Sequence, residues 1–399
     1  MKKLLLLGGS RYALPVIKAA HDLGHQIITC DYLPDNIAHK YSDEYCNVSI
    51  IEKDAVLEVA KRLKIDGVMS FACDPGVVTA AYVAEKLDLP NVGPYESVCI
   101  LQDKGRFRKF LTDHGFTVPT AKSYTLMEDA VKDAGMFHWP VIVKPTDSAG
   151  SKGVTRVNEP DMLRPAIKHA LEFSHNGHFI VEDFIQQKGF SSDTDSFSVN
   201  GNLKFVSFNC QRFDVKAENP YTPAAYSWPS SMSDAHQTEL SSEIQRLLHL
   251  LDMKTSVYNI ETREGIDDKA YIMECSPRGG GNRLSECLKY ATGVDLITNA
   301  VRGALGEEVI DVEQKDYNGY WAEIVIHGDK SGVFSGLLIS NELRDSIVER
   351  DLWVREGERI GGFTAANEAI GTLVLRFENQ NELQAVMNDI PKHIHVIVE

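Results

Sequence analysis

Two glutamates, Glu261 and Glu274, end two short apolar segments, YNIE and YIME, that flank a polar turn. A hairpin symmetric about Asp267 and Asp268 would place these glutamates opposite each other on one face of the sheet. Carboxylates at a cross-strand distance of about 5 Å repel each other, so this pairing predicts a cation between them. Mg²⁺ commonly binds one or two protein carboxylates together with substrate phosphates. The alternative is a pair of exposed glutamates on a surface hairpin.

The segment after Glu274 adds groups that bind anions. It reads CSPRGGGN, in which Ser276 and Arg278 precede three glycines at 279–281. Glycines allow a ligand to approach exposed backbone N–H groups, and a guanidinium recognises phosphate or carboxylate. A flexible turn is the alternative, but the neighbouring Glu274 favours an anion site beside the predicted metal.

A second group begins with Lys144, at the end of the apolar segment PVIVK. Backbone amides of glycine-rich loops approach phosphate oxygens, and lysines add positive charge. The candidate residues in the loop after Lys144 are Ser148, Gly150, Ser151, Lys152 and Gly153. The Walker pattern GxxxxGK[ST] is absent, so this loop is not a P-loop. We expect it to bind nucleotide phosphates, with a solvated lysine at a strand end as the alternative.

The apolar segment 179–185 contains two adjacent acids and is a candidate for the strand that holds adenine. Adenine needs an apolar slot with a backbone donor and acceptor. The residues expected there are Glu182, Asp183, Phe184 and Ile185. Asp103 and Lys104 begin a predicted helix that also carries Arg106 and Arg108. Lys104 is a further candidate for phosphate binding, and ordinary helix capping by the preceding acid is the alternative.

These residues need a framework of strands and helices. From residue 2 to about 100, short apolar runs alternate with helical patterns, which predicts parallel βαβ units and a Rossmann-like domain. From about 101 the pattern becomes mixed α+β. The predicted helices there are 103–113, 127–135, 159–172, 234–252, 292–305 and 380–389, and the predicted strands are 121–124, 140–144, 179–185, 194–200, 203–210, 255–263 and 269–275.

Two further segments complete the pattern. Residues 212–233 contain three prolines and many polar residues, which predicts a long loop that is either a substrate lid or a passive surface loop. Arg212, Lys216 and Tyr221 of this loop are candidates for the acceptor pocket. Residues 316–399 predict a small C-terminal domain rich in β-strands.

The composition is that of an ordinary globular protein, with 399 residues and a formal charge of −16. This length predicts two or three domains. The negative charge, without a basic stripe, argues against nucleic acid as a partner. No apolar run approaches the roughly 18 residues that span a bilayer, so no membrane partner is expected. Seven scattered cysteines without a CxxC motif, and an N-terminal apolar run of four leucines, indicate a cytoplasmic protein.

Taken in order, these segments resemble the ATP-grasp superfamily of carboxylate-amine and carboxylate-thiol ligases. Its members include biotin carboxylase, carbamoyl-phosphate synthetase, glycinamide ribonucleotide synthetase and L-amino-acid ligases. Asp103-Lys104 looks like that family's DK helix, 143–145 like its ATP-binding lysine strand, and 148–154 like its glycine-rich lid. Residues 182–185 resemble the adenine-binding hinge, and 274–281 resemble the signature E-x-N-P-R-x-G-G. The resemblance spans nearly the whole chain.

The resemblance implies an α/β plus α+β fold in three parts. These are a Rossmann-like domain at 1–100, an ATP-grasp domain at 101–315 whose lid subdomain covers about 120–185, and a small C-terminal α+β domain at 316–399. It implies a ligase in which a carboxylate attacks the γ-phosphate of ATP and an amine opens the resulting acyl phosphate. The cofactors would be ATP and Mg²⁺, with Mn²⁺ as an alternative metal. A homodimer is kept as an alternative to a monomer.

The resemblance also implies roles for particular residues. Arg278 would be the catalytic residue that stabilises the γ-phosphate or orients the carboxylate. Glu261, Glu274 and Ser276 would bind the metal. The residues that would bind ATP are Lys104, Lys144, Ser148, Gly150, Ser151, Lys152, Gly153, Glu182, Asp183, Phe184, Ile185 and Ser191.

Two positions depart from the family pattern. Ser276 stands where relatives commonly have a metal-binding asparagine, so its hydroxyl or a water would have to serve. Gly189 stands where many relatives have the acid that binds ribose, and Ser191 or Asp193 would take over after a two-residue shift.

Three other functions stay open at this point. Among ligases, the second interpretation is a carboxylase or a synthetase of the purine or carbamoyl-phosphate type, although no biotinylation segment is present. A non-catalytic nucleotide sensor would explain the changes at Ser276 and Gly189. An NAD-dependent oxidoreductase would explain Gly8, Gly9 and Asp31, but the pattern G-x-G-x-x-G is missing.

Overall fold

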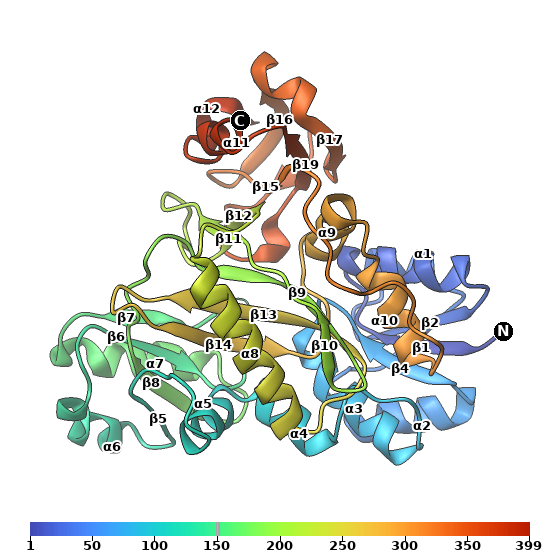
Figure 1. Ribbon diagram of the computed structural model, residues 1–399, viewed down its shortest axis with the longest axis horizontal. Coiled ribbons are helices and arrows are strands. Elements are labelled where there is room, and N and C mark those ends of the chain that lie inside the picture. The colour runs from blue at the N-terminus through green and yellow to red at the C-terminus, as the bar shows by residue number, and fades with distance from the viewer. Residues whose placement is uncertain (149, 151) are drawn as a thin grey trace.

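The computed structural model describes residues 1–148, 150 and 152–399. The strands of these residues form five sheets, which are followed from the N-terminus (blue) to the C-terminus (red) in Figure 1. Ser151, one of the predicted phosphate-binding residues, lies outside the described residues. The predicted combination of α/β and α+β architecture is confirmed.

The N-terminal sheet is parallel, with strand order β3-β2-β1-β4. Leu4 to Leu7 are fully buried in its first strand, so the leucine run is the centre of a sheet, as its pattern predicts. The strands are β1 (Lys3–Leu7), β2 (Gln26–Asp31), β3 (Glu44–Asn47) and β4 (Gly67–Ser70). The helices are α1 (Leu14–Asp22), α2 (Lys53–Leu63), α3 (Asp74–Lys86) and α4 (Tyr95–Gln102).

A second sheet, called the lid sheet because it falls within the predicted lid subdomain, is antiparallel, with strand order β5-β8-β6-β7. It lies at one side of the molecule, in green in Figure 1, and packs against α7 over a separate apolar core. Its strands are β5 (Ala121–Tyr124), β6 (Val141–Pro145), β7 (Thr155–Val157) and β8 (Phe179–Asp183). The helices of this region are α5 (Lys104–Asp113), α6 (Met127–Lys132) and α7 (Leu163–Glu172).

The central sheet is also antiparallel, with strand order β10-β9-β13-β14, and carries α8 against it. Its strands are β9 (Ser192–Val199), β10 (Asn202–Phe205), β13 (Ser256–Glu264) and β14 (Ala270–Ser276), and its helices are α8 (Asp234–Leu250), α9 (Leu284–Thr292) and α10 (Leu296–Ala304). The helix predicted at 292–305 is observed as the shorter α10, and the preceding α9 was not predicted. Gly293 adopts φ 79° and ends α9, and Asp295 caps the start of α10.

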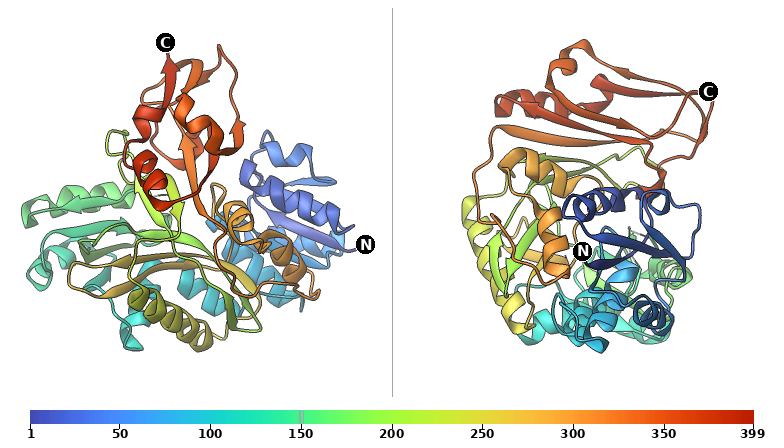
Figure 2. Two further views of the ribbon diagram at one scale, coloured as in Figure 1. Left: turned by 45° about the horizontal axis from the view of Figure 1, so that its top comes forward. Right: turned by 90° about the vertical axis from the view of Figure 1, so that its right-hand side faces the viewer.

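The C-terminal strands stand over the rest of the molecule, as Figures 1 and 2 show from different sides. Together with β11 and β12 from the middle of the chain, they form a five-stranded sheet of order β11-β12-β15-β19-β17, and they also form a three-stranded sheet of order β18-β16-β20. The strands are β11 (Cys210–Phe213), β12 (Pro223–Trp228), β15 (Tyr320–Ile326), β16 (Gly332–Ile339), β17 (Ile347–Leu352), β18 (Arg359–Ile360), β19 (Gly371–Phe377) and β20 (Ile394–Val398), with helices α11 (Gln380–Met387) and α12 (Ile390–His393).

The prediction of one long loop at 212–233 was wrong. Residues 223–228 form β12, which pairs with β15 and thereby joins the sheet on the C-terminal side of the predicted boundary at 315/316. Pro223 stands at the first residue of this strand, where a missing N–H is tolerated. Tyr226 and Trp228 are buried, so tertiary packing outweighs the local proline signal.

Two observations bear on the predicted environment. No helix in the described part of the chain is long and apolar enough to cross a membrane. The seven cysteines are free thiols, and five of them are buried.

Candidate active site

The hairpin of β13 and β14 pairs Glu261 with Glu274, as the sequence predicts. Near the turn, however, the register is shifted by one residue, because Glu264 pairs with Ala270. A β-bulge at Met273 restores the predicted pairing at the base of the hairpin. Directly paired residues point to the same face, so both carboxylates lie on one side of the central sheet.

Each of these two carboxylates has a cationic neighbour. Arg263 Nη2 donates to Glu261 Oε1 at 2.8 Å, and Lys104 Nζ lies 3.9 Å from Glu274 Oε2. The glutamate side chains keep 26% and 36% of their surface exposed, so a ligand can reach them. Oxygen donors that face each other and are open to solvent fit the hard, oxygen-seeking Mg²⁺.

Ser276, the third predicted metal ligand, is already engaged. Its hydroxyl donates to Asp74 Oδ1 at 3.0 Å and accepts a hydrogen bond from Gln102 Nε2 at 2.8 Å. It is 1% exposed. It therefore links the base of the hairpin to the N-terminal helices α3 and α4, and would bind a metal only if these contacts opened.

Arg278 is held by an acid from the N-terminal domain that the sequence analysis missed. Its Nε and Nη2 atoms donate to the two carboxylate oxygens of Asp74 at 2.8 and 2.7 Å. Its Nη1 atom donates to Asn259 Oδ1 at 3.1 Å and to the carbonyl of Gly279 at 3.0 Å. Burial alone would raise the pKa of Asp74, but the adjacent guanidinium outweighs it and lowers that pKa.

Gly279 and Gly280, the first two of the three glycines after Arg278, serve close packing, whereas Gly281 is half-buried. Gly279 and Gly280 are buried, and a Cβ at Gly279 would lie 2.2 Å from the ring of Phe71. The N–H of Gly280 donates to Asp195 Oδ1 at 2.8 Å, so a ligand cannot use it. The glycines let the chain pass between the N-terminal and central sheets.

Lys144 and Glu182 form a buried charge cluster with Arg108. Glu182 accepts hydrogen bonds from Lys144 Nζ and, at 3.1 Å, from Arg108 Nε. Burial would raise the pKa of Glu182, but Lys144 and Arg108 outweigh it and lower the pKa to about 2. Arg108 also donates to the carbonyls of Ile272 and Met273 at 3.0 and 3.2 Å, which ties the lid sheet to the bulge in β14.

The predicted adenine hinge is ordered by backbone contacts. Phe184 N donates to the carbonyl of Pro140 at 3.0 Å, and Ile185 is 9% exposed. Asp183 accepts hydrogen bonds from the backbone and ring of His138 at 2.8 and 2.9 Å. Its carboxylate is therefore engaged by His138 and is not free to bind a nucleotide. This segment can therefore contact adenine only through its apolar side chains and its main chain.

The described part of the glycine loop lies beside Lys104. The carbonyl of Ser148 accepts a hydrogen bond from Lys104 Nζ at 2.8 Å. Gly150 and Gly153 have φ values of 68° and 71°, which strongly favour glycine, and Lys152 is exposed. The structure thus brings Lys104, Lys144 and the start of the loop toward Glu274.

Asp193 joins the row of acids, whereas Ser191 does not. Ser191 is fully buried and its hydroxyl donates to Gln211 Oε1 at 2.9 Å, so it is not presented to a ribose. Asp193 pairs with Glu261 across β9 and β13, on the face of the predicted metal-binding acids. Burial, followed by the charge of Glu261, raises the pKa of Asp193 to about 8.

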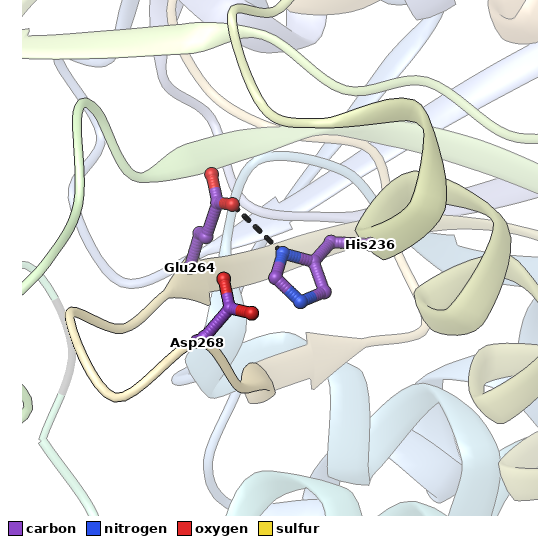
Figure 3. Close-up of side chains that lie close together, drawn as sticks. All are labelled: His236, Glu264 and Asp268. Atoms are coloured by element: carbon purple, nitrogen blue, oxygen red, sulfur yellow. Dashed lines mark hydrogen bonds and ion pairs between the residues drawn. The ribbon is translucent and has the colours of Figure 1, made fainter.

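A separate cluster at the tip of the hairpin has the composition of a metal site. Ligand atoms of His236, Glu264 and Asp268 lie within 4.8 Å of one another. Figure 3 shows these three side chains close together. Lys188 Nζ lies 3.3 Å from Glu264 Oε1 and 3.2 Å from Asp268 Oδ1, and His236 Nδ1 lies 2.7 Å from the same Glu264 oxygen. The ammonium and the imidazole already balance the two carboxylates, so we interpret this cluster as structural.

Comparisons with known proteins identify the domain and the fold. The model of the ATP-grasp domain family matches residues 137–286. The carbamoyl phosphate synthase large chain of Ralstonia nicotianae is 23% identical over 325 residues, which are 77% of this chain and 30% of that protein. The corresponding protein of Thermoanaerobacter is 24% identical over 326 residues, or 29% of its length. The chain thus spans about a third of the length of these curated relatives.

Solved structures match the chain over its whole length. The L-amino acid ligase of Bacillus licheniformis has a TM-score of 0.83 at 19% identity, with 100% of this chain and 99% of that chain covered. The phosphoribosylglycinamide synthetase of Anaerococcus prevotii has a TM-score of 0.77 at 23% identity, with both chains covered completely. The chain therefore contains an ATP-grasp domain and has the fold of the ATP-grasp ligases.

Proposed function

We propose that this protein is an ATP- and Mg²⁺-dependent ligase that activates a carboxylate as an acyl phosphate and joins it to an amine, releasing ADP and phosphate. The pairing of Glu261 with Glu274 beside Lys104, in a chain with an ATP-grasp domain, carries the proposal. Paired acids next to a lysine can hold a metal ion together with the phosphates of ATP.

Glu261 and Glu274 would hold the metal. When bound, Mg²⁺ neutralises charge on the phosphate oxygens during phosphoryl transfer. Lys104 and Lys144 add fixed positive charge from the protein. Because Lys144 donates to Glu182, which Arg108 holds in place, the Lys144 ammonium would need little reorganisation during the reaction.

Arg278 is suited to orient an anionic group. Asp74, Asn259 and Gly279 accept four of its five N–H groups, which fixes the plane of the guanidinium. The fifth N–H, on Nη2, remains for the carboxylate substrate or the γ-phosphate. Asp74 would act as a positioning residue, because it sets the direction of this donor.

A screen for ADP release tests the proposal. Purified protein with Mg²⁺ and ATP is incubated with a matrix of small carboxylates crossed with amines, and ADP and the joined product are measured together. Bicarbonate with ammonia belongs in the matrix, because carbamoyl phosphate synthase large chains are among the relatives. We expect one carboxylate class to give ADP and amide in equal amounts. Release of no ADP with any pair would contradict the proposal and favour a nucleotide sensor.

Hydroxylamine distinguishes the acyl phosphate from other intermediates. Hydroxylamine attacks an acyl phosphate to give a hydroxamate, so a productive acid should yield one in place of the amide. ADP formation with that acid but without hydroxamate would contradict the acyl-phosphate step while leaving ATP use intact.

A further inference from the structure

A row of polar side chains crosses the C-terminal sheet where an apolar core would be expected. Gln211, Tyr226 and Glu323 stand side by side on β11, β12 and β15. Gln211 Nε2 donates to Asp193 Oδ2 at 3.1 Å, so this row meets the row of acids on the central sheet. Asn282 Nδ2 donates to the hydroxyl of Tyr226 at 3.0 Å. We call these five residues the polar layer.

The two carboxylates of the polar layer lack a cation. Asp193 accepts hydrogen bonds only from neutral amides, Asn259 Nδ2 at 2.8 Å and Gln211 Nε2 at 3.1 Å. Glu323 is fully buried; its Oε1 accepts from the backbone N of Arg283 at 3.0 Å, and its Oε2 has no hydrogen-bond partner. Over the described ranges 1–148, 150 and 152–399, neither carboxylate forms an ion pair.

Nearby basic side chains are committed elsewhere. Arg283 binds Glu286 and Glu349, each at 2.6 Å, and Arg263 binds Glu261. Arg212 lies over the ring of Phe190, with its guanidinium carbon 4.2 Å from the ring centre. Arg278, which is bound to Asp74, and Arg283 act to lower the pKa values of Asp193 and Glu323, but burial outweighs both charges.

Burying a carboxylate without a cation is costly, so such a group takes up a proton or binds a cation. Burial is the largest cause that raises the pKa of Asp193 and of Glu323, each to about 8. Only Asp193 is partly open, because the unpartnered oxygen of Glu323 is covered. A ligand would therefore contact Asp193, and a cation bound there would favour the ionised form of Glu323 across Tyr226.

The position of Asp193 places that ligand next to the reaction. Asp193 is paired with Glu261, which in turn is paired with Glu274, so the three acids form one row across β9, β13 and β14. The other border is made by half-buried groups of the N-terminal domain, since Tyr12 donates to Asn282 Oδ1 at 3.1 Å. The partly open Asp193 offers carboxylate acceptors, which suit a group that has several N–H donors.

We propose that Asp193, supported by Glu323 across Tyr226, binds the positively charged nitrogen of the amine substrate, and that this substrate is a primary amine that enters as an ammonium ion. The identity of the ligand as the amine partner rests on the proposed ligase function. The ammonium site itself rests on the unpaired carboxylates of the polar layer. An ammonium offers three N–H donors and one positive charge, which match the acceptors and the charge of this layer.

Binding in the presence of MgADP tests the proposal without turnover. The probes are the proteinogenic L-amino acids and short diamines, each compared with its N-acetylated form, in which the nitrogen carries no charge. Calorimetry should show at least one primary amine that binds and whose N-acetylated form does not. Asp193→Asn should weaken that amine by at least about tenfold, because a charged hydrogen bond is lost, while leaving MgADP affinity within about twofold. Glu323→Gln should weaken it by a smaller factor.

Asp214→Asn is the matched control, because Asp214 directly follows β11 but is paired with His327 at 3.2 Å. It should bind the amine as the wild type does. Equal binding of amine and N-acetylated amine, unchanged affinity in Asp193→Asn, or no binding by any amine of the panel would each overturn the ammonium site. Amine binding without ADP formation in the substrate screen would contradict the proposed ligase function but not the ammonium site.

Discussion

Acidic side chains at the tip of the β13–β14 hairpin and on β9 beside its base have opposite surroundings. At the tip, Glu264 and Asp268 are balanced by Lys188 and His236, whose polar atoms lie within 3.3 Å of them. On β9 beside the base, Asp193 accepts hydrogen bonds only from neutral amides within the described part of the chain. Both ends bring several titratable side chains together, and by residue types alone the tip is the better candidate for a metal.

This difference separates structural charge from functional charge. A cluster whose charges cancel is complete without a ligand, and it mainly fixes the chain. A cluster that keeps unpaired acids is unfavourable by itself and is maintained where a ligand balances it. The predictions below change one end or the other, and they start with the largest effect.

Glu274→Gln should lower ADP formation by at least about a hundredfold, because it removes one charge from the metal-binding pair without changing volume. The measurement is the initial rate of ADP release with the productive substrate pair. Asp268→Asn at the exposed tip is the control and should keep near-normal rates. Comparable losses of ADP-release rate in both variants would contradict the functional difference between the tip and the base of the hairpin.

Asp74→Asn should lower kcat by about tenfold to a hundredfold with a smaller change in KM for ATP, since Arg278 loses a bidentate charged contact. Steady-state kinetics measure both parameters. Asp54→Asn serves as the control in the same domain, because Asp54 is exposed and accepts only from Tyr82. If Asp74→Asn changed folding stability alone, the positioning role would be wrong.

Glu323→Gln should stabilise the protein at alkaline pH. Burial raises the pKa of Glu323 in the folded state to about 8, above its usual value of 4.5, so folding takes up a proton in this window. Wild-type stability then falls as pH rises from about 4.5 to 8, by up to roughly 1.4 kcal/mol per pH unit, and glutamine removes this loss. Urea unfolding at pH 5 and pH 8 checks it. The free energy of unfolding of the variant should exceed that of the wild type only at pH 8.

His236→Gln at the tip should cost less than about 1 kcal/mol and leave ADP formation nearly unchanged. Its hydrogen bond with Glu264 raises the pKa of His236. The stabilisation is therefore complete below the ordinary histidine pKa of about 6.5 and is lost as pH rises through the raised value. Thermal unfolding at pH 6 and pH 8 checks the sign. A larger difference between variant and wild type at pH 8 would contradict the cluster as described.

Local patterns predicted the elements that carry the site. The strands β5, β8, β13 and β14 follow from short apolar segments, and the facing of Glu261 with Glu274 follows from the hairpin. The bulge at Met273 could not be predicted, because it depends on contacts outside the hairpin, such as those of Arg108. The predicted register near the turn was therefore wrong by one residue, whereas the predicted pairing of Glu261 with Glu274 is confirmed.

Long-range partners could not be predicted from spacing. Asp74 and Arg278 lie 204 positions apart, and only the fold brings them together. One local signal was available, because Asp74 begins a helix directly after a parallel strand, where ligand-binding residues gather. The prolines of 212–233 concealed β12. This strand, with Tyr226 and Trp228, pairs with β11 on one side and with β15, far along the chain, on the other.

The dependence of ADP binding on Mg²⁺ tests the acidic row most directly. Calorimetry of the wild type should show tighter ADP binding with Mg²⁺ than without it, because Glu261 and Glu274 hold the ion on the nucleotide. In Glu274→Gln, Mg²⁺ should hardly increase the affinity for ADP, while the affinity for ADP without metal should equal that of the wild type. An equal benefit from Mg²⁺ in both proteins would contradict the metal site at the base of the hairpin.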